Sequence, residues 1–125
     1  MKVKEIMNKA VTESHDIKVR DAAKIMSDGN IGSLILVNQD KIVGIVTDTN
    51  ILKNINKLDS GVSKVMSKNV ITIDENEGID NAAKIMREKK IKRLPVIRKG
   101  KLVGIITATD LIANSEELNE EFFFD

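Results

Sequence analysis

One short stretch of the sequence combines residue types that suit the binding of a nucleoside phosphate. It runs from Gly104 to Asp110, reads G-I-I-T-A-T-D, and lies where an apolar run gives way to a segment with helical character. Thr107 offers a hydroxyl, and the carboxylate of Asp110 can accept hydrogen bonds from two ribose hydroxyls. A glycine in a strand lets a ligand or a backbone approach closely, and the amides at a helix N-terminus suit an anion. A second interpretation stays open, in which Thr107 and Asp110 only cap the helix.

The sequence contains an internal repeat, which indicates the organisation of the chain before any single residue is considered. Residues 21–26 read D-A-A-K-I-M, and residues 81–86, 60 positions later, read N-A-A-K-I-M. Nearer the N-terminus, Met7 pairs with Met66 one residue out of step. Two copies are too few for a solenoid, so we expect them to close on each other as a pseudo-symmetric pair.

Apolar periodicity predicts the same elements in each copy, in the order β-α-β-β-α. Apolar residues at i, i+3, i+4 and i+7 predict helices from Val19 to Met26 and from Ile79 to Met86, with Gly29 as the C-cap of the first. Nearly continuous apolar runs predict strands buried on both faces. The other expected elements are strands at 11–12, 33–37, 42–46, 70–73, 94–97 and 102–106, helices at 49–55 and 109–118, and a linker at 57–61. We therefore expect an α/β (α+β) fold with domains at 1–58 and 59–125.

The composition restricts the possible functions. The chain has 125 residues and a net charge of +1, from 20 basic and 19 acidic side chains, which disfavours nucleic acid and anionic membranes as partners. It has no cysteine, and its one histidine, His15, makes neither a metal cluster nor a catalytic triad. No apolar run approaches the roughly 20 residues of a membrane-spanning helix. We expect a cytoplasmic protein without catalytic or metal-binding residues, and the single glutamine with abundant lysine and isoleucine favours a thermophile.

Several motifs in register resemble those of tandem CBS domains, the family named for cystathionine β-synthase. Both copies close with a G-h-x-T pattern, where h is apolar. The A-x-x-x-M helix of the family occurs at residues 22–26 and again at 82–86, and its R-x-P-V strand occurs once, at 93–96. The resemblance extends from about residue 3 to residue 114. It implies two β-α-β-β-α CBS repeats related by an approximate two-fold axis, which together form a Bateman module.

The resemblance also implies a function. Members of the family are regulatory modules that bind AMP, ADP, ATP or S-adenosylmethionine in clefts between the repeats, with no cofactor required. By similarity, Asp110 accepts the ribose hydroxyls, and Thr107 lies beside the ribose and the phosphate. The other residues that the resemblance places at this site flank the adenine or, where they are basic, hold phosphates: Thr72, Ile73, Lys92, Arg93 and Pro95. Such a module signals to a regulated protein, which the sequence does not identify.

The first copy departs from the family pattern at its ligand-binding residues. Thr47 matches Thr107, but Asn50 stands where the second copy has Asp110. An asparagine accepts through one oxygen only and carries no charge. The first copy also lacks the arginine and the proline of the R-x-P-V strand. We therefore expect the site built on Thr47 and Asn50 to bind weakly or to stay empty.

Basic side chains are concentrated in the second copy, where they would suit a polyphosphate. A solvated helix face is the alternative for most of them. Lys92 and Arg93 are the strongest candidates, because they enter the strand that is expected to line the cleft. The whole set comprises Lys84, Arg87, Lys89, Lys90, Lys92, Arg93, Arg98, Lys99 and Lys101.

Two other functions stay open at this point. The chain could be a dimerisation or interaction module whose ligand site is vestigial. An enzyme is disfavoured, because the sequence offers no nucleophile with a base and no metal site. We expect a homodimer, because CBS pairs commonly associate through helix faces and because the apolar Phe122–Phe124 segment needs cover.

Overall fold

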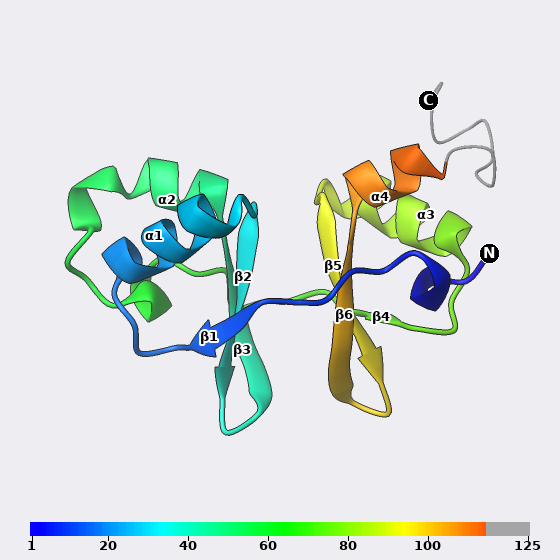
Figure 1. The fold of residues 1–125 in the computed structure, drawn as a ribbon, viewed down its shortest axis with the longest axis horizontal. Coiled ribbons are helices and arrows are strands. Elements are labelled where there is room, and N and C mark those ends of the chain that lie inside the picture. The colour runs from blue at the N-terminus through cyan, green and yellow to red at the C-terminus, as the bar shows by residue number, and fades with distance from the viewer. Residues whose placement is uncertain (115–125) are drawn as a thin grey trace. The chain divides into compact units, whose positions relative to one another are not determined.

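The computed structural model describes residues 1–114, which fold into two compact units (Figure 1). Unit 1 consists of Met1–Ala10 together with the chain from Ile71 onward, and unit 2 consists of Val11–Val70. The Phe122–Phe124 segment and positions 115–118 of the helix expected at 109–118 lie outside the described residues. No helix among the described residues combines the length and the hydropathy that crossing a bilayer requires.

Unit 2 is a three-stranded sheet with two helices packed beside it. Its elements in chain order are β1 (Thr12–Ser14), α1 (Val19–Gly29), β2 (Ser33–Asn38), β3 (Lys41–Thr47), α2 (Asp48–Lys53) and the 3₁₀ helices η2 (Ile55–Lys57) and η3 (Val62–Lys64). The central strand β2 pairs in parallel with β1 and antiparallel with β3. Since β1 and β2 are parallel, the chain needs a crossover between them, and α1 provides it.

Unit 1 repeats this plan with matching residues. Its elements are η1 (Val3–Glu5), β4 (Ile73–Asp74), α3 (Ile79–Lys89), β5 (Arg93–Arg98), β6 (Lys101–Thr107) and α4 (Ala108–Ala113). Strand β5 is central, with β4 parallel to it and β6 antiparallel. The β-α-β-β-α order and the α/β class expected from the repeat are therefore confirmed.

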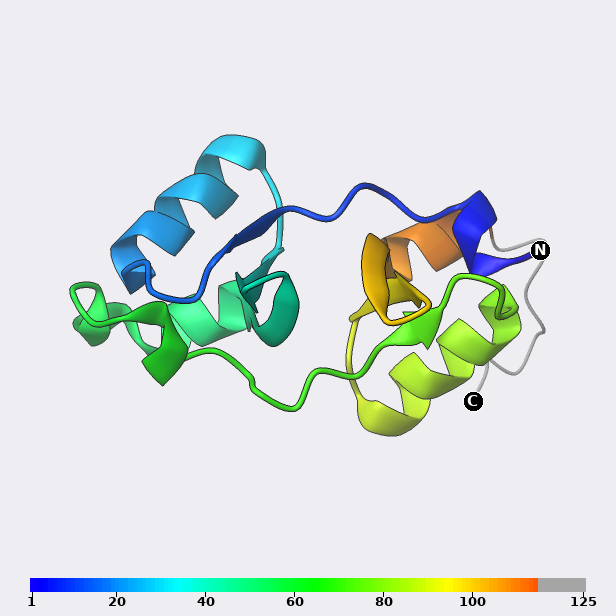
Figure 2. The same ribbon diagram turned by 90° about the horizontal axis from the view of Figure 1, so that it is seen from below.

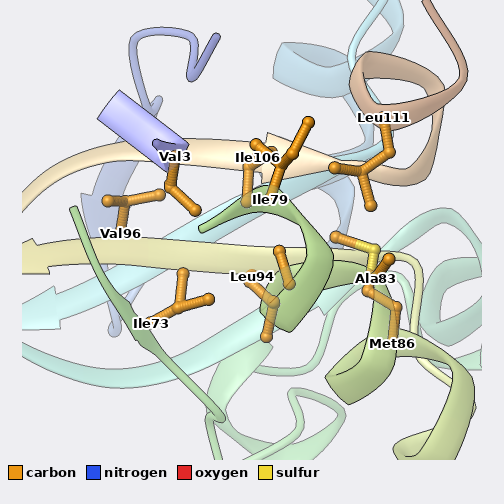
Figure 3. Close-up of a cluster of buried hydrophobic side chains, with 10 residues drawn as sticks. Val3, Ile73, Ile79, Ala83, Met86, Leu94, Val96, Ile106 and Leu111 are labelled. Carbon is orange, nitrogen blue, oxygen red and sulfur yellow. The ribbon is translucent and has the colours of Figure 1, made fainter. Parts of the chain in front are cut away.

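Each unit has its own hydrophobic core, formed where the apolar faces of the helices meet the sheet. Figure 3 shows this core in unit 1, where Ile79, Ala83 and Met86 of α3 lie with Leu94 and the other buried side chains. The predicted helix faces are buried, except that Ala23 of α1 is only half-buried. The run L-I-L-V of β2 contains three consecutive buried residues, as predicted, and the middle of β5 is buried in the same way. The second predicted run, L-V-G-I-I of β6, is only partly buried, and its burial is more nearly alternating, as in β3.

The first segment of the chain belongs to unit 1. Val3 of η1 is fully buried there, and its amide donates to the carbonyl of Glu77 at 2.8 Å. Val62 of η3 does the same in unit 2, where its amide donates to Ile17 at 2.8 Å. The boundary between residues 58 and 59 follows the sequence repeat, but the compact units divide the chain elsewhere, because η1 packs with the elements that follow residue 70.

Two details of the helices differ from expectation. Gly29 is the last residue of α1, and the left-handed capping residue is Asn30, with φ of 51°. Asparagine tolerates that conformation better than most residues because its short polar side chain bonds locally. Helix α2 ends at Lys53, since the side chain of Asn54 donates to the carbonyl of Asn50 at 2.8 Å and closes the last turn. Asn114 closes α4 in the same way at 2.9 Å.

Candidate functional site

Thr107 and Asp110 form a capping box where β6 runs into α4. The backbone amide and the hydroxyl of Thr107 both donate to Oδ2 of Asp110, at 2.8 and 2.9 Å. In return, the amide of Asp110 donates to Oγ1 of Thr107 at 3.2 Å. This arrangement satisfies two of the amides that a helix start leaves unpaired. The structure shows that the two residues do cap α4, and the cap occupies only one of the two carboxylate oxygens.

The other carboxylate oxygen is held by a residue that the sequence analysis missed. Nδ2 of Asn8 donates to Oδ1 of Asp110 at 2.8 Å, across 102 residues of sequence. Two backbone bonds of 2.9 Å between Asn8 and Ile105 place the side chain there. The pairing of Met7 with Met66 was the available signal, because it aligns Asn8 with Ser67 in the other copy.

Unit 2 contains the same cap, but the side-chain atom that takes no part in the cap is a different one. Oδ1 of Asn50 accepts from the amide and the hydroxyl of Thr47, at 2.8 and 3.0 Å. The amide of Asn50 donates to Oγ1 of Thr47 at 3.3 Å. Asparagine therefore caps as aspartate does, but its second polar atom is an NH₂ donor, whereas the second oxygen of Asp110 is a charged acceptor.

The glycines that precede these caps make room for the chain itself. A Cβ on Gly104 would lie 2.7 Å from Sδ of Met7 and 2.9 Å from the carbonyl oxygen of Asn8. A Cβ on Gly44 would lie 2.4 Å from Sδ of Met66. A glycine in this strand was expected to let either a ligand or a backbone approach closely. The structure shows the approach of the chain's own backbone and side chains.

Pro95 changes the hydrogen bonding beside β4. In unit 2 the amide of Ile35, at the matching position of β2, donates to the carbonyl of Val11 at 3.1 Å. Proline has no N–H, so Pro95 cannot make this bond to Ile71, which matches Val11. Strand β4 is accordingly shorter than β1, and it begins at Ile73. The backbone of Ile71 and Thr72 is left outside the sheet ladder.

Arg93 and Lys92 lie at the same end of the sheet as the Asp110 cap. Arg93 is the register partner of Thr107 across β5 and β6. The carbonyl of Lys92 accepts from the amide of Ala108 at 2.8 Å, while its side chain is exposed. Pro95 is buried, and Arg93 is half-buried. Most of the other basic side chains lie exposed on α3 and on the β5–β6 turn, as a solvated face predicts.

Seven of the nine predicted site residues belong to unit 1, and two belong to unit 2. Unit 1 holds Thr72, Ile73, Lys92, Arg93, Pro95, Thr107 and Asp110, whereas unit 2 holds Thr47 and Asn50. Ile73 is buried and pairs with Val96, so only its backbone is placed to meet a ligand. Within residues 1–114, no group of three or more His, Cys, Asp or Glu side chains could hold a metal ion.

The two α/β units repeat one plan, and each has a capping box where its last strand runs into its last helix. The family model described as CBS domain matches residues 3–57 and again residues 62–117. The chain therefore belongs to the CBS-domain family, and the family expected from the sequence motifs is confirmed.

Relatives and solved structures agree with this assignment. Uncharacterized protein MJ1232 of Methanocaldococcus jannaschii is 38% identical over 95 residues, which are 75% of this chain and 32% of MJ1232. CBS domain-containing protein YhcV of Bacillus subtilis is 32% identical over 117 residues, which are 90% of this chain and 84% of YhcV. The CBS domain pair of protein MJ0100, in complex with 5′-methylthioadenosine and S-adenosylmethionine, has a TM-score of 0.87 at 33% identity and covers 93% of this chain and 96% of that chain. The chain spans about a third of the length of MJ1232 and under two thirds of several other relatives.

Proposed function

We propose that this chain is a regulatory CBS pair that binds an adenosyl ligand on unit 1 through Asp110. The observation that carries the proposal is that one oxygen of this carboxylate can still accept a hydrogen bond. The cap uses Oδ2, and Oδ1 accepts a single hydrogen bond, from Asn8. A carboxylate oxygen has two acceptor positions, so a ribose hydroxyl can still bond to Oδ1. The complex of the MJ0100 pair with 5′-methylthioadenosine and S-adenosylmethionine supports an adenosyl group as the ligand.

The surrounding residues supply complementary chemistry for the rest of such a ligand. Pro95 has no amide N–H to donate to the carbonyl of Ile71, whereas Ile35 donates to Val11 in unit 2. The carbonyl of Ile71 is therefore suited to accept from an adenine amino group. Lys92 and Arg93 place positive charge at the end of β5 that adjoins the Thr107 cap. AMP, ADP, ATP and S-adenosylmethionine all combine an adenosine with a polar 5′ group that such cations can attract or tolerate.

The site on unit 2 is the weaker of the two in this proposal. The NH₂ of Asn50 donates where Oδ1 of Asp110 accepts, and it carries no charge. Hydrogen bonds to charged groups contribute about 1.5–3 kcal/mol each. A difference of about 1.4 kcal/mol already corresponds to a tenfold change in the dissociation constant. We therefore expect the unit 2 site to bind at least about tenfold more weakly.

Thermal shift with a panel of AMP, ADP, ATP and S-adenosylmethionine tests the function. A ligand present at 100 times its dissociation constant stabilises a folded protein by about 2.7 kcal/mol. The decisive variant is Asp110→Asn, because Asn50 shows that asparagine preserves the cap. We expect this variant to fold normally and to lose most of its affinity in titration calorimetry. No shift of the wild-type protein with any member of the panel would favour the interaction module with a vestigial site.

We propose that the chain acts in regulation rather than in catalysis. A cytoplasmic CBS pair of this kind passes the ligand signal to a protein partner and needs no cofactor. We infer that it does so as a homodimer. Leu52 of α2 is 72% exposed, and Ile112 of α4, at the matching position of unit 1, is 58% exposed. Exposed apolar side chains that recur on equivalent helices suit an interface between copies of the chain.

A further inference from the structure

We propose that Asn8 is a specificity-determining residue, which together with Asp110 selects ligands that carry both hydroxyls of a ribose. The inference rests on the proposed function and assigns the second acceptor that such a ligand needs. It starts from the 2.8 Å hydrogen bond between Nδ2 of Asn8 and Oδ1 of Asp110. Neither the sequence motif nor the family match points to Asn8.

The hydrogen bonds of Asp110 leave room for one ligand hydroxyl and no more. Oδ2 already accepts from the amide and the hydroxyl of Thr107, which fills both of its acceptor positions. Oδ1 accepts from Asn8 and has one position left. The carboxylate therefore cannot accept from two ribose hydroxyls while the cap and the Asn8 bond persist.

The carboxamide oxygen of Asn8 is an acceptor beside Asp110 that could take the second hydroxyl. It shares a carbon with Nδ2, whose bond to the carboxylate fixes which end of the amide faces Asp110. Within the described part of the chain, no hydrogen bond engages this oxygen, and Asn8 is exposed to solvent. Oδ1 of Asp110 and the amide oxygen of Asn8 thus form a pair of neighbouring acceptors.

The backbone holds Asn8 in place before any ligand arrives. Its amide and carbonyl both bond to Ile105 of β6 at 2.9 Å, and the preceding side chain, Met7, lies against Gly104. Val3 anchors the same segment in the core of unit 1. A side chain that is held in its bound position loses little conformational freedom on binding, which favours affinity and selectivity.

Unit 2 lacks this second acceptor in the same form. Ser67 takes the place of Asn8 and makes the matching backbone bonds to Ile45, at 2.9 and 3.0 Å. Its side chain is shorter, and no hydrogen bond links it to Asn50 among the residues that the structure describes. Discrimination between ribose and deoxyribose is therefore expected from unit 1 only.

Titration calorimetry with AMP, 2′-deoxy-AMP and 3′-deoxy-AMP tests the role of Asn8. A site built to bond a hydroxyl rejects a ligand without it. We expect wild-type protein to bind AMP at least about tenfold more tightly than the deoxy nucleotide that lacks the hydroxyl bonded to Asn8. Asn8→Ala should weaken AMP binding and reduce that ratio to about threefold or less. Asn8→Ser, which copies the residue of unit 2, tests the same loss with a side chain that this backbone position accepts. Ser67→Ala is the matched control and should change neither value by more than about twofold.

The outcomes separate this inference from the proposed function. If wild-type protein binds AMP and Asp110→Asn abolishes binding, but both Asn8 variants keep the full ratio, the role of Asn8 is overturned and the proposed function stands. Tighter AMP binding by Asn8→Ala would also overturn it, because Asn8 would then compete with the ligand for Asp110. If wild-type protein binds none of the three nucleotides, nucleotide binding on unit 1 fails together with the role of Asn8.

Discussion

Thr107 and Asp110 bond each other in both directions, with the amide and hydroxyl of Thr107 on Oδ2 of Asp110 and the amide of Asp110 on Oγ1 of Thr107. A residue that is expected to bind a ligand therefore also holds the start of α4 in place. Thr47 and Asn50 make the same three bonds in unit 2. Loss of binding in a variant of Asp110 must consequently be separated from loss of stability.

The first prediction makes that separation. Asp110→Ala removes the carboxylate that accepts from Thr107 but keeps the bond from the amide of residue 110 to Oγ1 of Thr107. It should lower the free energy of unfolding by about 0.5–1.5 kcal/mol, whereas Asp110→Asn should lower it by much less. Urea denaturation of both variants without ligand measures the difference. Equal losses of stability would contradict the equivalence of the two caps.

The second prediction concerns a gain of binding on unit 2. Asn50→Asp keeps the cap and turns an NH₂ donor into a charged acceptor, so we expect AMP binding on unit 2 to tighten at least about tenfold. Calorimetry should then detect a second binding event that is weak or absent in the wild-type protein. Asn50→Ala supplies no acceptor and serves as the control, with no second event expected. An unchanged titration of Asn50→Asp would argue that more than this one residue disables unit 2.

The third prediction tests the backbone beside Pro95. Pro95→Ile restores the amide that Ile35 has in unit 2, so it should bond the carbonyl of Ile71 and stabilise the unit by about 0.5–1.5 kcal/mol. The same bond removes an acceptor for adenine, and we expect AMP binding to weaken. The reciprocal change, Ile35→Pro, leaves the carbonyl of Val11 without its donor and should destabilise by at least about 1 kcal/mol. A Pro95→Ile variant with full affinity would show that the Ile71 carbonyl takes no part in binding.

The fourth prediction compares two glycines. Gly104→Ala places a Cβ 2.9 Å from the carbonyl oxygen of Asn8, which is backbone, whereas the three atoms nearest to a Cβ on Gly44 belong to the flexible side chain of Met66. Overpacking typically costs about 1–3 kcal/mol, and we expect Gly104→Ala to cost more than Gly44→Ala. Chemical denaturation measures both. The double variant Gly44→Ala with Met66→Ala should recover part of the loss, and a failure to do so would show that Met66 is not the obstacle.

The fifth prediction concerns assembly. Leu52→Glu and Ile112→Glu place charge on the exposed apolar positions of α2 and α4, so they should shift a dimer toward monomer in light scattering at micromolar concentration. Lys53→Glu changes a neighbouring exposed position without removing an apolar side chain and is the control. A monomeric wild-type protein would refute the homodimer directly.

Much of the fold could be predicted from local sequence alone. The 60-residue offset and the apolar spacing from Val19 to Met26 predicted both copies of the β-α-β-β-α unit, because periodicity reports which face of each element is buried. The 3₁₀ helices η1 and η3 escaped prediction, since three residues are too few to show a period. The helix ends at Lys53 and Ala113 also escaped it, because side-chain bonds from Asn54 and Asn114 set them.

The division between sequence and tertiary structure is clearest at the candidate site. Sequence alone determined that unit 1 carries a carboxylate and a proline where unit 2 carries Asn50 and Ile35, because residue type is a local property. Only the tertiary structure decided that Asn8, 102 residues away, donates to the carboxylate oxygen of Asp110 that the cap does not use. It also decided that the N-terminal segment belongs to unit 1. Both follow from the burial of Val3 and the backbone pairing of Asn8 with Ile105. Such contacts depend on which surfaces meet in the folded chain, and beyond the pairing of Met7 with Met66 no local pattern of residues indicates them.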